Sequence, residues 1–186
     1  EFLASERLNK FDFSIHMSLG MIYQFRKIDK GKALEYFAKA SRYAKPESNF
    51  FASYAMLHEA QMHFELGRPD EAEKICGEAA SLSPTFSEAT YQHAQYNAQL
   101  GNGVLALACL EEAILMDKIY CLKVRADEMF DPIRSAVDGL LDSIREREKE
   151  KACLAYTQLE EIANIVDPIA IQVANDALVD RPDWMF

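Results

Sequence analysis

SYAMLHEAQMHFELGRPDEAEKICGEAASLSPTF, residues 53–86, is followed without a gap by SEATYQHAQYNAQLGNGVLALACLEEAILMDKIY, residues 87–120. The two stretches are 34 residues long and agree at nine positions when they are aligned end to end. Small residues account for much of the agreement, with Ala60 matching Ala94 and Gly67 matching Gly101. A fixed period of this length is typical of proteins that stack copies of one small structural unit.

The shared residues are those that close packing of two helices requires. Ala60 falls in the middle of a helical stretch, where a small side chain lets a second helix approach. Gly67 ends that stretch, where a left-handed backbone conformation costs least for glycine. Ala72 and Ala79 then lie seven residues apart, on one face of the next helix. Each unit is therefore predicted to be an antiparallel helical hairpin with a tight turn.

The 34-residue period and its small-residue pattern resemble the tetratricopeptide repeat (TPR) family. Pro84 closes the first unit where that family usually has proline, whereas Lys118 occupies this position in the second. An earlier, degenerate copy contains Leu19-Gly20 and then KALEYFAKA from Lys32, and its turn carries one extra residue. The resemblance implies an all-α fold, a right-handed α-solenoid of about three helix hairpins with C-terminal capping helices.

The sequence suggests two parts: repeats within residues 1–130 (about 12–52, 53–86 and 87–120) and a C-terminal helical extension and tail in residues 131–186. At the start of the second part, Asp131 can cap a helix and Pro132 can occupy its first position. The surrounding FDPIR stretch resembles the segment that closes many bacterial TPR arrays. Such a cap is needed because the last repeat would otherwise expose its stacking face.

The helix predicted after this cap carries two apolar stripes with a charged stretch, residues 145–151, between them. A solvated bridge and a coiled-coil segment that pairs with another chain are both compatible with this pattern. Asp167-Pro168 predicts a break, with a short helix to Val179 after it. The stripes are Ile133, Val137, Leu140, Leu141 and Ile144, then Leu154, Leu159, Ile162 and Val166.

The resemblance to TPR domains implies a concave groove, lined by the first helix of each hairpin, that binds a partner peptide or helix. We therefore expect a non-catalytic adaptor; the alternative is self-association through the repeats and the C-terminal helix. The apolar members of the lining could equally be core residues. The expected ligand is neutral or basic and partly apolar, and the chain's own tail, residues 181–186, is a candidate occupant. The implied lining is Met17, Met21, Tyr54, Leu57, Gln61, Glu65, Glu88, Tyr91, Gln95 and Gln99.

Other classes of function find little support. His58 and His63 resemble the zinc-protease motif HExxH, but five-residue spacing puts them about 140° apart around a helix, so we expect no metal and no cofactor. No nucleotide-binding or nucleophile motif occurs, which disfavours an enzyme. A formal charge of −10 disfavours nucleic acid and anionic membranes. Four scattered cysteines and the lack of a long apolar run indicate a cytoplasmic protein that does not insert into a membrane.

Overall fold

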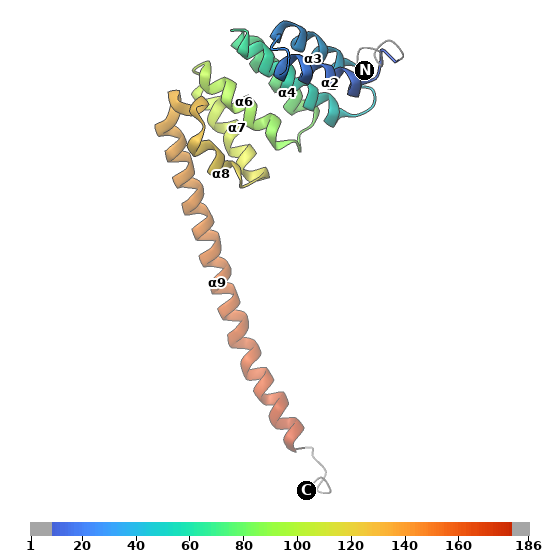
Figure 1. Cartoon of the computed structure of the whole chain (residues 1–186). Coiled ribbons are helices and arrows are strands. Elements are labelled where there is room, and N and C mark those ends of the chain that lie inside the picture. The colour runs from blue at the N-terminus through green and yellow to red at the C-terminus, as the bar shows by residue number, and fades with distance from the viewer. Residues whose placement is uncertain (1–8, 180–186) are drawn as a thin grey trace. The chain divides into compact units, whose positions relative to one another are not determined.

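The computed structural model describes residues 9–179, with side chains at all of these positions except 165, 167, 171 and 174–179. Every secondary-structure element within that range is helical (Figure 1). The chain divides into two compact units between Leu140 and Leu141. The elements are α2 (Phe13–Phe25), α3 (Lys30–Ala44), α4 (Asn49–Glu65), α5 (Pro69–Leu82), α6 (Ser87–Gln99), α7 (Gly103–Met116), α8 (Tyr120–Lys123), η1 (Val124–Ala126), η2 (Glu128–Ile133) and α9 (Arg134–Val179).

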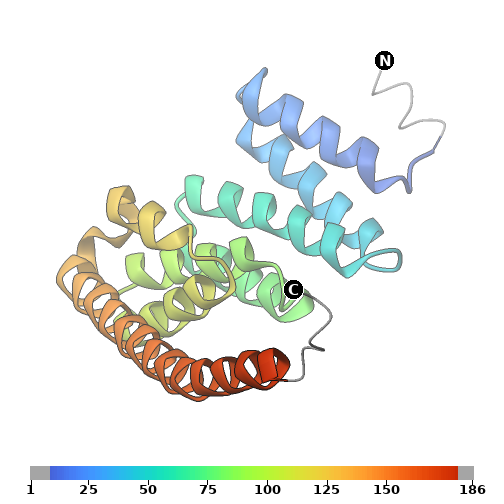
Figure 2. The same cartoon turned by 90° about the horizontal axis from the view of Figure 1, so that it is seen from below.

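Helices α2 to α7 form three consecutive antiparallel hairpins: α2 with α3, α4 with α5, and α6 with α7. Each hairpin also packs on the next, through α3 with α4 and α5 with α6 (Figure 2). The prediction of an all-α solenoid of three hairpins is therefore confirmed. Helix α4 begins at Asn49, four residues ahead of the repeat boundary at residue 53, because Ser48 caps it by accepting a hydrogen bond from the Phe51 backbone N–H.

The turns of the second and third hairpins have the predicted glycine conformation. Gly67 and Gly101 adopt φ angles of 76° and 79°, in the left-handed region. The turn of the first hairpin has no glycine at the corresponding place, and Ile28 takes a left-handed φ of 52° instead. The Ile28 side chain is 78% exposed, so the strain of this β-branched residue is not offset by burial.

Replacing Ile28 by glycine is expected to stabilise the first hairpin, since a left-handed conformation costs an ordinary residue about 1–2 kcal/mol. The added backbone freedom of glycine in the unfolded chain reduces this gain, so we expect a net increase of roughly 0.5–1 kcal/mol in the free energy of unfolding. Urea denaturation measures it. The control is Ile28→Ala, which keeps the Cβ atom and hence most of the strain. An equal gain in both variants would contradict the explanation.

Small residues permit the close helix contacts within the hairpins. A Cβ atom added to Gly20 on α2 would lie 2.5 Å from Cε1 of Phe37 on α3. Ala60, Ala72 and Ala106 are fully buried. The predicted role of small residues at these positions is thus confirmed, and the space that they leave is filled by neighbouring side chains.

Ala72→Leu and Ala106→Leu should each destabilise the chain by about 1–3 kcal/mol, because the added atoms have no free volume to occupy. Thermal and urea denaturation provide the measurement. Ala108 also lies on α7 but is exposed, so Ala108→Leu is a matched control with little expected effect. Wild-type stability of both buried variants would mean that the repeat register is wrong.

Residues 120–133, which we call the cap segment, follow the third hairpin and contain α8, η1 and η2. Asp127 caps η2 by accepting a hydrogen bond from the Met129 backbone N–H at 3.0 Å. The prediction that Asp131 caps the next helix, with Pro132 in its first position, is wrong. Pro132 lies inside η2, and α9 begins at Arg134. Asp131 instead pairs with the Arg134 guanidinium at 2.6 Å.

Helix α9 runs without interruption from Arg134 to Val179, so the predicted break at Asp167-Pro168 is also wrong. Proline removes one backbone hydrogen bond and leaves the carbonyl of Asn164 without its helical donor. Asn164 and Pro168 are exposed, and water can satisfy such a carbonyl at a helix surface. The charged residues 145–151 are exposed too, with ion pairs such as Lys149–Glu146 at 2.8 Å. This stretch agrees with a solvated helix surface.

Candidate functional site

Helix α6 directs its predicted groove residues toward the cap segment. The Tyr91 hydroxyl and the Gln95 Nε2 both donate to Asp127 Oδ2 at 2.6 Å. Gln99 Nε2 donates to the backbone carbonyl of Met129 at 2.6 Å. The part of the groove that α6 was expected to supply is therefore occupied, at these three residues, by a segment of the same chain.

Aromatic stacking accompanies these hydrogen bonds. The Tyr91 ring stacks on Tyr120, with ring centroids 4.5 Å apart, and lies 5.6 Å from the ring of Phe130. The ammonium of Lys123 lies 4.5 Å from the centroid of the Tyr91 ring. Burial, together with the hydrogen bond to Asp127, raises the pKa of Tyr91, so its hydroxyl remains a donor at neutral pH. The cap segment and α6 thus share one aromatic core.

The ten predicted groove residues differ in their exposure. Met17, Leu57 and Tyr91 are buried, with only 8%, 4% and 0% of their surface exposed. They therefore lie beneath the predicted groove surface and do not form part of it. The exposed and half-buried members are Met21, Tyr54, Gln61, Glu65, Glu88, Gln95 and Gln99.

The two acidic members of this set are each paired with a lysine outside it. Glu65 Oε2 lies 3.0 Å from Lys30 Nζ, at the start of α3. Glu88 Oε2 lies 3.0 Å from Lys123 Nζ in the cap segment and accepts a hydrogen bond from the Tyr120 hydroxyl at 2.9 Å. The two lysines partly neutralise these carboxylates, so the predicted groove is less acidic than its own residues suggest.

A hollow of about 800 Å³ lies where α4, α6 and the cap segment meet. It receives Phe64 from α4 and Gln99 from α6, and the remaining wall comes from the cap segment. Asp127 and Glu128 give this wall a negative charge that Lys123 only partly balances. The residues of the wall are Lys123, Ala126, Asp127, Glu128 and Met129.

An aromatic cluster lies at the opposite end of α4, and we call its four members, the exposed Phe50, Phe51 and Tyr54 and the half-buried Phe86, the aromatic patch. Phe50 and Phe51 are 48% and 46% exposed, and Tyr54 is 36% exposed. The Phe50 ring lies 4.9 Å from Phe86 and 5.6 Å from Phe51. Only Tyr54 was predicted as a site residue. The signal for Phe50 was its position four residues before Tyr54, on the same helix face.

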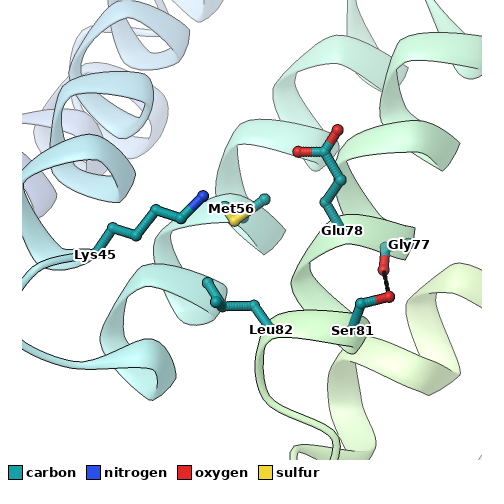
Figure 3. A pocket seen from close by; sticks show the side chains of 6 residues that line it. All are labelled: Lys45, Met56, Gly77, Glu78, Ser81 and Leu82. Atoms are coloured by element: carbon teal, nitrogen blue, oxygen red, sulfur yellow. Dashed lines mark hydrogen bonds between the residues drawn. The ribbon is translucent and has the colours of Figure 1, made fainter.

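A second hollow, of about 490 Å³, opens beside α5 (Figure 3). Met56 of α4 contributes to it, and this residue lies about 200° around the helix from Tyr54. Figure 3 shows Lys45 and Glu78 at its rim, whereas the Ser81 hydroxyl donates to the carbonyl of Gly77 at 2.9 Å. This hollow therefore lies on a different face of α4 from the predicted groove.

Helix α7 exposes apolar residues where α5, one repeat earlier, has charged ones. Val104 and Leu105 are 88% and 45% exposed, and the corresponding residues of α5 are Asp70 and Glu71. The alignment of the two repeats contains the signal for this difference.

The first histidine of the HEAQMH stretch, His58, packs between two aromatic rings. His58 stacks on Phe37, with centroids 4.9 Å apart, and meets the edge of Tyr54 at the same distance. Burial lowers the pKa of both His58 and His63. Within residues 9–179, no group of three or more His, Cys, Asp or Glu side chains converges as metal ligands. The absence of a metal remains a prediction, which zinc titration of the purified protein tests.

Glu59, between these histidines, is held in a partly buried position, where its Oε2 accepts a hydrogen bond from the Ser41 hydroxyl at 3.0 Å. Burial raises the pKa of Glu59, and the nearby Glu78 acts in the same direction. The folded chain therefore keeps a proton on this carboxyl at pH values where the unfolded chain has lost it. The resulting stability is complete below the ordinary pKa of 4.5 and is lost as the pH rises through the folded-state value.

Glu59→Gln should therefore raise the free energy of unfolding at about pH 8 and leave it nearly unchanged below about pH 4.5. Glutamine can still accept the Ser41 hydrogen bond but has no charge to desolvate. Denaturation at several pH values gives the comparison. Glu47→Gln, at an exposed position, serves as the control. A pH-independent difference would exclude the titration of Glu59 as its cause.

A Cys–His–Glu arrangement lies between α5, α6 and α7. Cys109 Sγ is 3.5 Å from His93 Nδ1, and His93 Nε2 is 2.8 Å from Glu73 Oε1. Cys109 is buried, and burial raises the pKa of its thiol to about 11. The thiol is thus protonated at neutral pH, whereas a nucleophilic cysteine needs a lowered pKa. This geometry is better suited to packing than to catalysis.

The geometry defines a class of protein: a solenoid of helical hairpins whose last repeat is covered by a cap. Comparisons with solved structures make this class more specific. A crystal structure of MamA matches with a TM-score of 0.59 and 16% identity, over 81% of this chain and 86% of that chain. The first TPR of Spaghetti (RPAP3), bound to the HSP90 peptide SRMEEVD, matches with a TM-score of 0.53 and 15% identity. This match covers 70% of this chain and 94% of that chain.

A third match is the APC/C hetero-tetramer Cut9-Hcn1, with a TM-score of 0.56 and 18% identity. It covers 73% of this chain but only 25% of that one. No protein-family model and no curated protein matches the sequence. The chain therefore has the TPR fold, and at these identities the likeness concerns the fold alone. No helix within the described residues is long and apolar enough to cross a membrane.

Proposed function

We propose that this chain is a non-catalytic adaptor that binds an extended or helical segment of a partner protein along the first helices of its hairpins. The observation that carries the proposal is the aromatic patch. Phe50 and Phe51 leave nearly half of their surface in contact with water, although large aromatic side chains favour burial. Aromatic residues dominate the binding energy of many protein interfaces.

The polar part of the proposed site supports a ligand that is neutral or basic and partly apolar. Gln61, on the same helix as Tyr54, donates to Glu65 at 3.0 Å and can exchange this bond for one to a peptide. Four carboxylates, Glu65, Glu88, Asp127 and Glu128, border the surface with two lysines, Lys30 and Lys123. The remaining negative charge disfavours an acidic segment.

The covering of α6 by the cap segment shifts the proposed site toward α2 and α4. We assign binding to residues 1–130 and a separate role to the extension, residues 131–186. Among the predicted residues, Met21, Tyr54, Gln61 and Glu65 remain the proposed contacts, with Phe50 and Phe51 added to them. The RPAP3 domain, which its structure shows with an HSP90 peptide, is a precedent for a fold of this kind holding a short segment.

Selection from a random peptide library on the immobilised chain tests the proposal. The selected peptides should be neutral or basic with large apolar residues, and fluorescence anisotropy gives their affinities. The Phe50→Ala/Tyr54→Ala double variant should bind them at least about tenfold more weakly.

The matched control is Phe11→Ala, because Phe11 is 59% exposed and its ring packs against Tyr43, which is not a member of the aromatic patch. If no peptide is enriched, or if the double variant and the control bind alike, the aromatic patch is not a binding surface. Enrichment of acidic peptides would contradict the proposed charge preference.

A further inference from the structure

The second unit of the chain, from Leu141 onward, exposes an apolar row with a regular spacing. The row consists of Ala155, Leu159, Ile162, Val166, Ile169 and Val173, with steps of four, three, four, three and four residues. All six are exposed, and the five larger ones keep 52% to 64% of their surface in contact with water. We call this row the seam.

Alternating steps of three and four residues are the pattern of a coiled coil. The average of 3.5 residues keeps the apolar row facing a partner helix as the two wind around each other. The continuity of α9 is essential here, because a break at Pro168 would separate Ile169 and Val173 from the rest. Pro168 itself is not a seam residue, because it lies between the consecutive seam residues Val166 and Ile169.

The positions beside the seam carry no charge. In the heptad that the seam defines, the flanking residues are Tyr156, Gln158, Ala163, Ile165, Ala170 and Gln172. Charges at these positions normally select a different partner sequence or repel an identical one. Glu160 and Glu161 lie farther from the seam, so in a pair of identical helices they need not face each other. The flanks therefore permit pairing of this helix with a copy of itself.

Residues of this sequence outside the described structure cannot cover the seam as a helix. From Ala155 to Val173 a helix rises about 27 Å. Residues 1–8 and 180–186 would span only about 12 Å and about 10 Å as helices. Upstream, Arg145 and Glu148 occupy seam positions, so pairing begins after residue 151. The charged stretch then acts as a spacer before the paired part.

We propose that the chain self-associates through the seam, with a second copy of α9 as the occupant. The seam and the aromatic patch share no residues, so self-association and peptide binding are tested independently of each other. An assembly of this kind presents two or more copies of the repeat unit, which increases the apparent affinity for a partner with several binding segments.

Sedimentation equilibrium of the full chain, from low to high micromolar concentration, tests the proposal. The wild type should show at least twice the mass of a single chain at the higher concentrations. Ile162→Lys places a charge in the middle of the seam and should give a single-chain mass throughout. Circular dichroism should show unchanged helix content, because lysine is a good helix former at an exposed site.

Leu154→Lys is the matched control: Leu154 is 62% exposed and Ile162 is 56% exposed on the same helix. The sequence pattern groups Leu154 with Leu159, but five residues of helix put the two about 140° apart, so Leu154 lies outside the seam. This variant should associate like the wild type. A single-chain mass for the wild type at every concentration would overturn the proposal. Association that Ile162→Lys leaves intact, or that both variants abolish equally, would also overturn it, because the seam would then not be the contact.

Discussion

Replacing Phe130 by alanine should lower the free energy of unfolding by about 3–5 kcal/mol, the usual cost of removing a fully buried aromatic side chain. Phe130 has no exposed surface, and its ring lies against Tyr91 of α6. The deletion leaves a cavity between the cap segment and the last hairpin.

Urea denaturation and calorimetry measure this loss. Phe25→Ala is the matched control, because Phe25 is 68% exposed and the same atoms are removed from water-accessible surface. We expect the control to change stability by less than about 1 kcal/mol. A similarly small effect at Phe130 would show that the cap segment does not stabilise the repeats.

This prediction depends on a feature that the sequence revealed only in part. The need for a cap was evident, because a stack of repeats must end in a surface that water tolerates. The FDPIR stretch marked its position. Its geometry was not evident, since short 3-10 turns lack the 3.6-residue apolar period by which a helix is recognised. The sequence pattern therefore predicts Asp131 as a helix cap, whereas in the structure Asp127 caps η2.

The repeats themselves were largely predictable, because their determinants are local. Gly67 and Gly101 specify the turns, and Ala72 and Ala106 specify close helix contacts. The first turn was harder to place because Ile28, and not glycine, has the left-handed conformation there. At this position the backbone hydrogen bonds that close the turn, such as that from the Asp29 N–H to the Tyr23 carbonyl, override the local preference of a β-branched residue.

For the candidate site, the sequence predicts which side of a helix each residue lies on, but not whether that residue is exposed. The spacing of Tyr54, Gln61 and Glu65 placed them on one side of α4, and they are exposed or half-buried as a surface requires. Burial of Leu57 and Tyr91 depends on what covers them, which spacing cannot reveal. Lys30 and Lys123, which pair with Glu65 and Glu88, come from other helices. The proposed tail occupant, residues 181–186, lies outside the described residues.

Asp127→Ala should destabilise the chain by about 2–4 kcal/mol, because hydrogen bonds to a charged group each contribute about 1.5–3 kcal/mol and are not fully additive. The carboxylate accepts from the Tyr91 hydroxyl, Gln95 Nε2 and the Met129 backbone N–H. Its removal leaves the Tyr91 hydroxyl buried without its acceptor, which is the costly part of the change. Urea denaturation of each variant gives the value.

Asp131→Ala is the control, since Asp131 is an exposed acid four residues away, and its ion pair with Arg134 contributes at most about 1 kcal/mol. A Tyr91→Phe change completes a double-mutant cycle with Asp127→Ala. Because phenylalanine has no hydroxyl to leave unpaired, Asp127→Ala should cost less in the Tyr91→Phe background than in the wild type. Equal costs in both backgrounds would show that Asp127 does not hold the cap segment on α6 through Tyr91. The covering of the α6 face would then depend on the aromatic stacking and on the other polar contacts, such as the hydrogen bond from Gln99 to the Met129 carbonyl.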